Sequence, residues 1–296
     1  MHALGEQENA RGLTMPAGGF CKVSNNTGIL AETLSLSSCS PCMITSSVLV
    51  HVADPFNTLH LSEFFKLYNN SYDVIAKKSP SRICCEYNTF LYLKKNFSIN
   101  DNIKILDIGC GKGVSIDLFS RYFKSFSYQG CDKFRRENWG KLEKENVTFF
   151  THNLGVKIFK KTENFDLIYS QSVFEHVEND LSGFLSIKAA FPSAKQIHFV
   201  PSPLSFLNYL KHGFRRYSFK SLLNLEKYIN TPMIIQKVAG KKAFRLYFPL
   251  YYKVSKRKHI FNFLREKSED KNNKDYLTNL LSDNSKSLPI FYLISF

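Results

Sequence analysis

The chain has 296 residues, of which 44% are hydrophobic and 15% aromatic. That composition is enough for a large packed core, so it excludes a wholly disordered protein. The formal net charge of +15 suits an anionic partner such as nucleic acid, a membrane surface or a phosphorylated substrate, although a plain Lys- and Asn-rich composition gives the same charge.

The first residues predict a poorly ordered N-terminal extension over residues 1–56, because they are rich in Gly, Ser, Thr and Cys and keep no helical or strand period. They show no apolar signal-peptide segment, and the seven cysteines form no regular framework. We therefore expect a reducing, cytoplasmic protein. Peripheral contact with the inner membrane surface stays open as an alternative.

Residues 57–100 are predicted to form an N-terminal helical segment. Apolar side chains recur at helical spacing from Leu61 to Ile75, and a second helical stretch runs from Glu86 to Leu93. Asn100-Asp-Asn102 then breaks the chain.

From residue 101 to 296, predicted strands and helices alternate. The strands are expected at 103–108, 126–131, 147–151, 165–170, 196–200, 233–238 and 288–296, and helices at 114–122, 217–228 and 275–281. This alternation predicts an α/β fold with a doubly wound, mainly parallel sheet and helices on both of its faces.

A strand, a glycine loop and a helix follow one another around Ile105-Leu-Asp-Ile-Gly-Cys-Gly-Lys-Gly113. In a doubly wound sheet such a turn lies at the carboxyl end of the strand, where ligands bind. Gly109, Gly111 and Gly113 let the backbone approach a ligand closely. Asp107, at the strand end, suits a cationic group better than a pyrophosphate.

A second acid, Asp132, ends the next predicted strand. An acid at that place, about 20 to 25 residues past the loop, can bind both ribose hydroxyls of a nucleoside. Asp107 and Asp132 together indicate a nucleoside that carries a cationic, amino-acid-like tail.

These residues resemble the class I S-adenosylmethionine-dependent methyltransferases. Leu106 to Gly113 is similar to the first motif of that family, and Asp132 to its ribose-binding acid. The resemblance covers about residues 85–296 and implies a Rossmann-like, seven-stranded sheet whose last strand is antiparallel. It also implies S-adenosyl-L-methionine as the cofactor.

The resemblance extends to the adenine side, where Asn153 matches the polar residue that meets the adenine amino group. Leu154, Phe149 and Phe150 could supply apolar walls, with core packing as the alternative role of the two Phe. The predicted cofactor-binding residues are Asp107, Gly109, Cys110, Gly111, Gly113, Asp132, Lys133, Asn153, Leu154 and Ser170.

Asn164 to Val177 resembles the fourth-strand motif of small-molecule methyltransferases, a strand followed by Glu-His and a hydrophobic residue. The resemblance implies that Ser170 and Gln171 lie near the sulfonium and its methyl group. It also implies that Glu175 and His176 face the acceptor.

Some relatives bind a divalent metal here through a Glu three residues before the Glu-His pair. Ser172 occupies that position in this chain, so only two of three ligands remain and we predict no metal. His176 is the predicted catalytic base, since imidazole titrates near neutral pH. A structural or pocket-lining role for His176 is the alternative.

A second acceptor patch follows the fifth predicted strand and contains His198, Arg215 and Arg216. The two arginines could bind a phosphate or carboxylate of the acceptor, or stand at a solvated helix entrance. Both arginines lie in a predicted basic insert on the acceptor side, at about residues 202–267. Fifteen basic and two acidic residues between Lys211 and Lys267 hold +13 of the net charge.

The leading hypothesis is methyl transfer from S-adenosylmethionine to a small or lipid-linked, anionic acceptor, such as a cell-surface saccharide intermediate. An RNA methyltransferase that uses the basic and aromatic stretch is the first alternative. A nucleic acid is less favoured because no RNA-binding module or Asn-Pro-Pro-Tyr-type motif is present. A non-catalytic cofactor-binding scaffold is the second alternative.

Overall fold

The structure is a computed structural model that describes residues 58–159, 163–207, 213–240, 273–282 and 289–296. The predicted N-terminal extension lies outside these residues, as does most of the basic stretch from Lys211 to Lys267. All the described residues belong to one unit, Ser46–Phe296.

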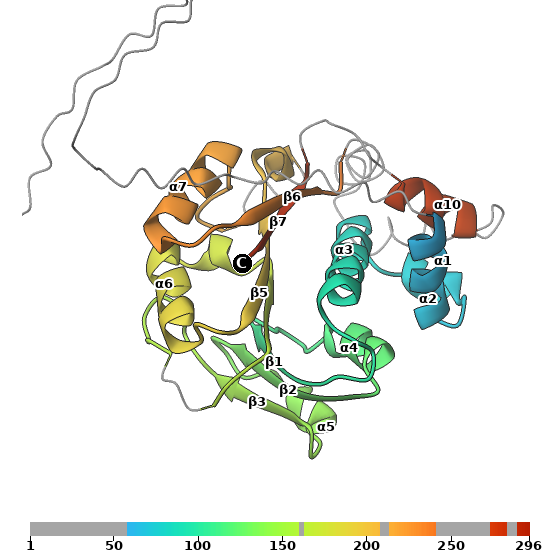
Figure 1. The fold of residues 1–296 in the computed structure, drawn as a ribbon, viewed down its shortest axis with the longest axis horizontal. Helices are drawn as coiled ribbons and strands as arrows, with labels where there is room; N and C mark the ends of the chain where they lie inside the picture. The colour runs from blue at the N-terminus through green and yellow to red at the C-terminus, as the bar shows by residue number, and fades with distance from the viewer. Residues whose placement is uncertain (1–57, 160–162, 208–212, 241–272, 283–288) are drawn as a thin grey trace, which may run out of the picture. The chain divides into compact units, whose positions relative to one another are not determined.

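Seven strands form one sheet (Figure 1). They are β1 (Asn102–Ile108), β2 (Ser125–Asp132), β3 (Val147–Thr151), β4 (Leu167–Gln171), β5 (Lys195–Pro201), β6 (Ile234–Val238) and β7 (Phe291–Ser295). The order in the sheet is β3-β2-β1-β4-β5-β7-β6. The first five strands along the chain pair in parallel, whereas β7 is antiparallel to both β5 and β6. The predicted doubly wound sheet and its antiparallel last strand are confirmed.

Helices cover both faces of this sheet (Figure 1). They are α1 (Thr58–Leu67), α2 (Tyr72–Ala76), α3 (Pro80–Asn96), α4 (Ile116–Tyr122), α5 (Trp139–Leu142), α6 (Asp180–Ala190), α7 (Phe219–Ile229) and α10 (Asn273–Leu281), with short 3₁₀ turns η1 (Phe174–His176) and η2 (Pro203–Leu207). Side chains of α1, α3, α4 and α10 share one hydrophobic cluster with Ile105, and those of α6 and α7 share another with Leu106. Because alternate residues of β1 point to opposite faces, the helices form two layers around the sheet.

Some predicted helices differ from the observed ones. The helical spacing from Leu61 to Ile75 is interrupted at Asn69 and Asn70, whose φ angles of 52° and 55° are left-handed. Asn tolerates that conformation, so α1 and α2 are separate helices. α3 begins earlier than predicted because Ser79 accepts a hydrogen bond from the Arg82 amide and Pro80 fits the first turn.

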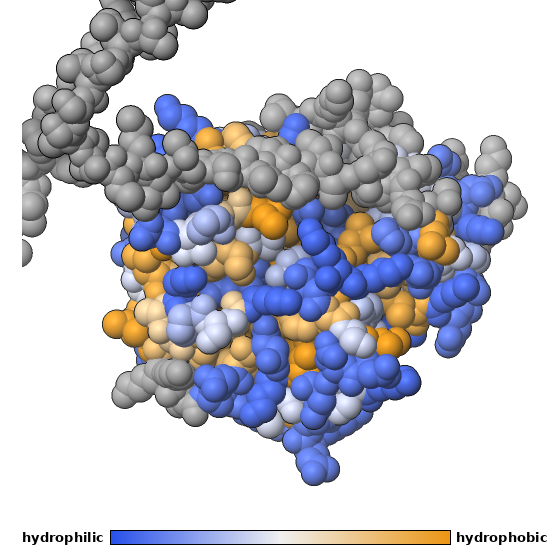
Figure 2. Space-filling model, viewed as in Figure 1, coloured by the Kyte–Doolittle hydropathy of each residue, from blue (hydrophilic) through white to orange (hydrophobic). Residues whose placement is uncertain are grey.

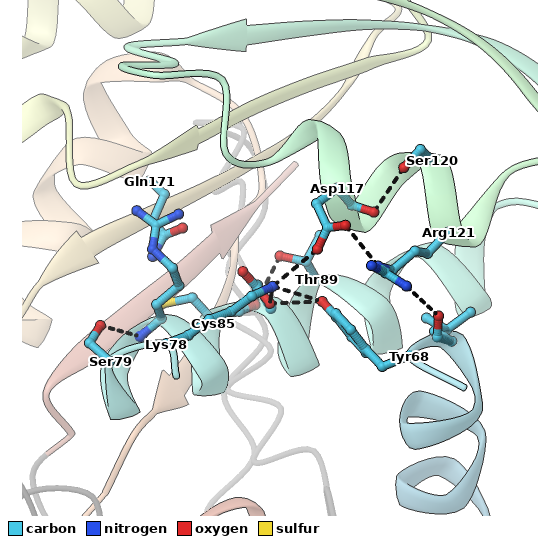
Figure 3. Close-up of polar contacts among 12 residues, drawn as sticks. Tyr68, Lys78, Ser79, Cys85, Thr89, Asp117, Ser120, Arg121 and Gln171 are labelled. Carbon is cyan, nitrogen blue, oxygen red and sulfur yellow. Dashed lines mark hydrogen bonds and ion pairs between the residues drawn. The ribbon is translucent and has the colours of Figure 1, made fainter. Parts of the chain in front are cut away.

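A polar network joins the N-terminal helices to α4, the helix that follows the glycine loop (Figure 3). Lys78 Nζ lies 2.8 Å from Glu86 Oε2 and 3.3 Å from Asp117 Oδ2. The Tyr68 hydroxyl donates to Glu86 at 2.9 Å, and Arg121 donates to Asp117 at 2.8 Å. Glu86 is almost fully buried, and a buried carboxylate requires such partners. The network therefore fixes α1 and α3 against α4.

The surface of the molecule mixes hydrophilic and hydrophobic residues, and Figure 2 shows hydrophobic side chains exposed in several places on one face. Among the described residues, no helix combines the length and the apolar character needed to cross a membrane.

Candidate cofactor and acceptor site

A cavity of about 380 Å³ opens where β1, β2, β3 and β4 end. Its wall is formed by Ile108, Gly109, Asp132, Lys133, Phe134, Arg136, His152, Asn153, Leu154, Ser172, Val173, His176 and Val177. Six of these residues are predicted site residues: Gly109, Asp132, Lys133, Asn153, Leu154 and His176. In a doubly wound sheet, ligands bind at this carboxyl edge of the strands.

The glycine loop approaches this cavity with left-handed backbone at Gly109 (φ 67°) and Gly111 (φ 54°). A Cβ at Gly109 would lie 2.3 Å from Val173 Cγ2, whereas a Cβ at Gly111 would meet no atom within 4 Å. Gly109 is therefore needed for packing, and Gly111 leaves open space beside the backbone. The indole of the buried Trp139 holds the loop by donating to the Gly111 carbonyl at 2.8 Å.

The carboxylate of Asp132 is fixed at the cavity wall by three donors. The Gly111 amide donates to Oδ2 at 3.0 Å, and the Phe134 amide to Oδ1 at 3.3 Å. Arg136 Nη2 lies 3.2 Å from Oδ1 and 3.3 Å from Oδ2. An ionised carboxylate has about four acceptor sites, so these contacts fill it. A ribose diol that binds Asp132 would have to replace Arg136.

We therefore expect Arg136→Ala to tighten the binding of S-adenosylhomocysteine. A half-exposed ion pair contributes roughly 0.2–1 kcal/mol, which corresponds to a gain of up to about fivefold in affinity. Isothermal titration calorimetry measures this change. Arg135→Ala is the matched control, because the Arg135 guanidinium is exposed and lies 3.7 Å from Glu143 and 5.9 Å from the centroid of the Trp139 ring, away from Asp132. Weaker binding by Arg136→Ala would mean that Arg136 contacts the ligand itself.

The side of the cavity that we predicted to bind adenine is formed by the segment after β3. Asn153 and Leu154 line it, together with His152, whose ring stacks on Phe159 with centroids 3.9 Å apart. Burial lowers the pKa of His152. Phe149 stacks instead on Trp139 at 5.0 Å and packs in the hydrophobic core.

Several predicted cofactor-binding residues lie behind the cavity wall. Asp107 is almost fully buried and accepts a hydrogen bond from the Tyr128 hydroxyl at 2.7 Å, and burial raises its pKa to about 7. Cys110 is buried in the loop, and burial raises the pKa of its thiol. Gly113 (φ 71°) closes the loop before α4. Asp107, Cys110 and Gly113 therefore shape the loop from behind.

Ser170 and His198 form a buried pair in the sheet. The Ser170 hydroxyl lies 2.8 Å from His198 Nδ1, and both side chains are fully buried. Burial lowers the pKa of His198 to about 3, so its ring is neutral. His198 therefore belongs to the core and not to the acceptor patch that we expected. Contact between Ser170 and a ligand would have to come from its backbone.

On the acceptor side, Glu175 and His176 differ in exposure. The side chain of His176 is 45% exposed, whereas Glu175 is fully buried, with its Oε1 atom 4.0 Å from His176 Nε2. Burial raises the pKa of Glu175 to about 7, and burial and then Arg216 lower the pKa of His176. The structure thus differs from the expectation that Glu175 faces the acceptor: Glu175 lies behind His176, and the Phe214 amide donates to its backbone carbonyl at 2.6 Å.

The two arginines have different surroundings. Arg215 donates to the Asp180 carboxylate and to the Glu178 carbonyl, so it is held within the protein. Arg216 lies near Glu175, as the effect of each on the pKa of the other shows. Both border a second cavity of about 480 Å³. It is lined by Asp180, Leu181, Phe214, Arg215, Arg216, Tyr217, Ser221, Asn224, Leu225 and Tyr228.

Gln171 lies on the face of β4 that is turned toward α3 (Figure 3). Its Oε1 atom accepts a hydrogen bond from the Tyr169 hydroxyl at 3.1 Å. Next to it, Ser172 adopts a left-handed φ of 56°, which is uncommon for a residue with a side chain. In the described ranges, no three His, Cys, Asp or Glu side chains come together as a possible metal site.

Five further residues that the sequence patterns do not indicate line the cofactor cavity: Phe134, Arg136, His152, Val173 and Val177. Ser172, which the sequence indicates only as the position of a metal ligand, lines it as well. All six follow directly after β2, β3 or β4. Counting a few residues beyond each predicted strand would have found them, because the carboxyl ends of parallel strands converge on one edge.

The sheet order, the antiparallel β7 and the acid at the tip of β2 define a Rossmann-like methyltransferase fold. Residues 79–198 match the family model of a methyltransferase domain. The chain therefore contains a methyltransferase domain, which is consistent with a class I S-adenosylmethionine-dependent methyltransferase. No curated protein matches its sequence.

Three solved structures illustrate the similarity of this fold to known proteins. An S-adenosylmethionine-dependent methyltransferase from Mesorhizobium loti is 15% identical, with a TM-score of 0.45 over 70% of this chain and 95% of its own. The YcgJ protein from Bacillus subtilis is 16% identical, with a TM-score of 0.41 over 69% and 93%. The plantazolicin methyltransferase BamL, solved with a substrate analogue and S-adenosylhomocysteine, is 14% identical, with a TM-score of 0.43 over 80% and 88%.

A methyltransferase domain in this fold implies S-adenosyl-L-methionine as the cofactor, and the residues of the cavity fit it. A carboxylate fixed by backbone amides suits the ribose diol, and the space beside Gly111 admits a ligand close to the backbone. When bound, S-adenosylmethionine supplies an electrophilic methyl group.

Proposed function

We propose that this methyltransferase modifies a small or lipid-linked acceptor, with a cell-surface saccharide intermediate as the favoured class. The observation that carries the proposal is the second cavity, which adjoins the catalytic side through the contact of Phe214 with Glu175. Its wall combines the exposed rings of Phe214 and Tyr228 with the polar side chains of Ser221 and Asn224. Aromatic faces and hydrogen-bonding groups together suit a sugar, and a cavity of this size suits a small molecule.

We assign the cofactor to the first cavity, with Asp132 on the ribose and Asn153 and Leu154 on the adenine. Because the leaving group of a sulfonium departs neutral, much of the rate enhancement comes from positioning. Lys133 lies at the cavity wall, and Gln171 is the last residue of β4, next to Ser172 of that wall.

We assign the proton transfer to His176. The lowered pKa keeps its imidazole neutral near pH 7, so it can accept a proton from an acceptor hydroxyl or amine. Arg216, close to Glu175 and His176, could hold an anionic group of the acceptor. Arg215 supports this wall through its contacts with Asp180 and Glu178.

The acceptor class is tested by comparing cells with and without the gene. Surface glycans and RNA nucleosides are both examined by mass spectrometry for species that lack one methyl group. We expect the loss in a glycan or a lipid-linked intermediate. Complementation with wild type should restore it, and His176→Gln should not. A methyl group missing only from RNA would establish the RNA alternative, and no missing methyl group with an intact cofactor site would favour a non-catalytic scaffold.

A further inference from the structure

Two loops on the rim of the cofactor cavity expose large apolar side chains. Val156 and Ile158, after β3, are 75% and 76% exposed, the highest values among the large hydrophobic residues of the described ranges. Phe134, after β2, is 59% exposed and lines the cavity itself. Exposed apolar side chains gathered around a functional opening mark an interaction surface.

The turn that carries Val156 and Ile158 is anchored on both sides. Leu154 and Phe159 are buried, and the Phe159 amide donates to Ser186 Oγ at 2.9 Å. Gly155 adopts a φ of 91°, and a Cβ there would lie 2.6 Å from Val177 Cγ1. The turn is therefore held against the cavity wall at both ends, and the three residues between them, Val156 to Ile158, are exposed.

Basic side chains alternate with these apolar ones. Lys133, Arg135 and Lys157 are exposed on the same two loops, and Lys133 Nζ lies 5.2 Å from the centroid of the Phe134 ring. Two of the acids near the rim are engaged, since Asp132 is paired with Arg136 and Glu143 is approached by Arg135, whereas Glu137 is exposed on the same loop. The rim thus presents apolar tips among positive charges.

We infer that this rim, defined by Phe134, Val156, Ile158 and the three basic residues, docks on the anionic surface of a lipid bilayer. A stable protein partner needs a continuous area of roughly 800 Å² per side, whereas these side chains stand on two loop tips around a hollow. Separate apolar tips among cations suit insertion between anionic headgroups. In this orientation the cofactor cavity opens toward the membrane, where a lipid-linked acceptor would be held.

The basic stretch from Lys211 to Lys267 is a different feature that could also contact a membrane. The test distinguishes vesicle binding by the rim from vesicle binding by that stretch. Vesicles of phosphatidylcholine, with and without phosphatidylglycerol, are sedimented with wild type and with Val156→Asp/Ile158→Asp. We expect wild type to bind only the anionic vesicles and the double variant to lose roughly tenfold or more of that binding. The matched control is Val74→Asp/Ile99→Asp, two exposed positions away from the rim, which should bind like wild type.

The thermal shift caused by S-adenosylhomocysteine, measured without vesicles, shows that the double variant keeps its fold and its cofactor site. Vesicles should also slow hydrogen exchange over residues 153–159 in wild type. Equal vesicle binding by the double variant and wild type, or equal binding to neutral vesicles, would overturn the inference. Neither result would bear on methyl transfer, which the cofactor shift tests by itself.

Discussion

Asp132→Ala is expected to abolish the rise in melting temperature that S-adenosylhomocysteine produces in the wild-type protein. The carboxylate is fixed by the amides of Gly111 and Phe134, and its other acceptor positions are taken by Arg136, which the ribose diol would replace. A hydrogen bond to a charged group contributes about 1.5–3 kcal/mol, so the loss of two should weaken binding by roughly 10²- to 10⁴-fold. Differential scanning fluorimetry and calorimetry measure the two effects.

Two further variants make this result specific. Asp132→Asn keeps the size of the side chain and one acceptor oxygen, and should bind with intermediate affinity. Asp101→Ala removes an exposed carboxylate that accepts only from the Ser98 amide at 2.7 Å in the described structure, and should shift like wild type. If wild type itself shows no shift at millimolar ligand, the cofactor assignment fails.

Glu175→Gln is expected to change how stability depends on pH. Burial raises the pKa of Glu175 from 4.5 to about 7 in the folded protein. Between these values the folded state keeps the proton and the unfolded state releases it, so rising pH lowers the free energy of unfolding. The loss begins near pH 4.5, is complete above about pH 7 and amounts to up to about 3 kcal/mol. The variant carries no charge and should lose less stability over this window.

Denaturant unfolding at pH 4.5 and pH 8 measures the difference. Part of the loss of stability between pH 4.5 and pH 8 should remain in the variant, because burial also raises the pKa of Asp107 to about 7. Glu178→Gln, a change at an exposed neighbour, should follow wild type. If Glu175→Gln and wild type lost the same free energy of unfolding between the two pH values, the buried carboxylate would not control this pH dependence.

The strands and the cofactor cavity could be predicted because their signals are local. The run before Gly109, the acid at the end of β2 and the alternation of strands and helices each depend on neighbouring residues. Even the antiparallel last strand followed from the family resemblance. α6 was missed because its apolar residues face the core without a clear helical period, and its start depends on Asn179, whose side chain caps the Ser182 amide.

The extent to which each polar side chain is buried could not be predicted, because burial depends on packing between segments that are distant in the sequence. Nothing near Glu175 in the sequence shows that Gly213 and Phe214 lie against it. Ser170 is fixed on His198, which belongs to the next strand of the sheet. Likewise, Arg136 looks like one more surface cation until the fold brings it onto Asp132.

The placement of β7 has a consequence for the order of folding. Among the described strands, β6 pairs only with β7, and β7 follows it along the chain after more than 50 residues. During synthesis, β1 to β5 can therefore assemble while β6 has no hydrogen-bonding neighbour and its edge of the sheet is unprotected. Completion of the sheet has to wait for a long-range contact that forms late, and such contacts slow folding. A chaperone that shields this edge would act between the appearance of β6 and that of β7.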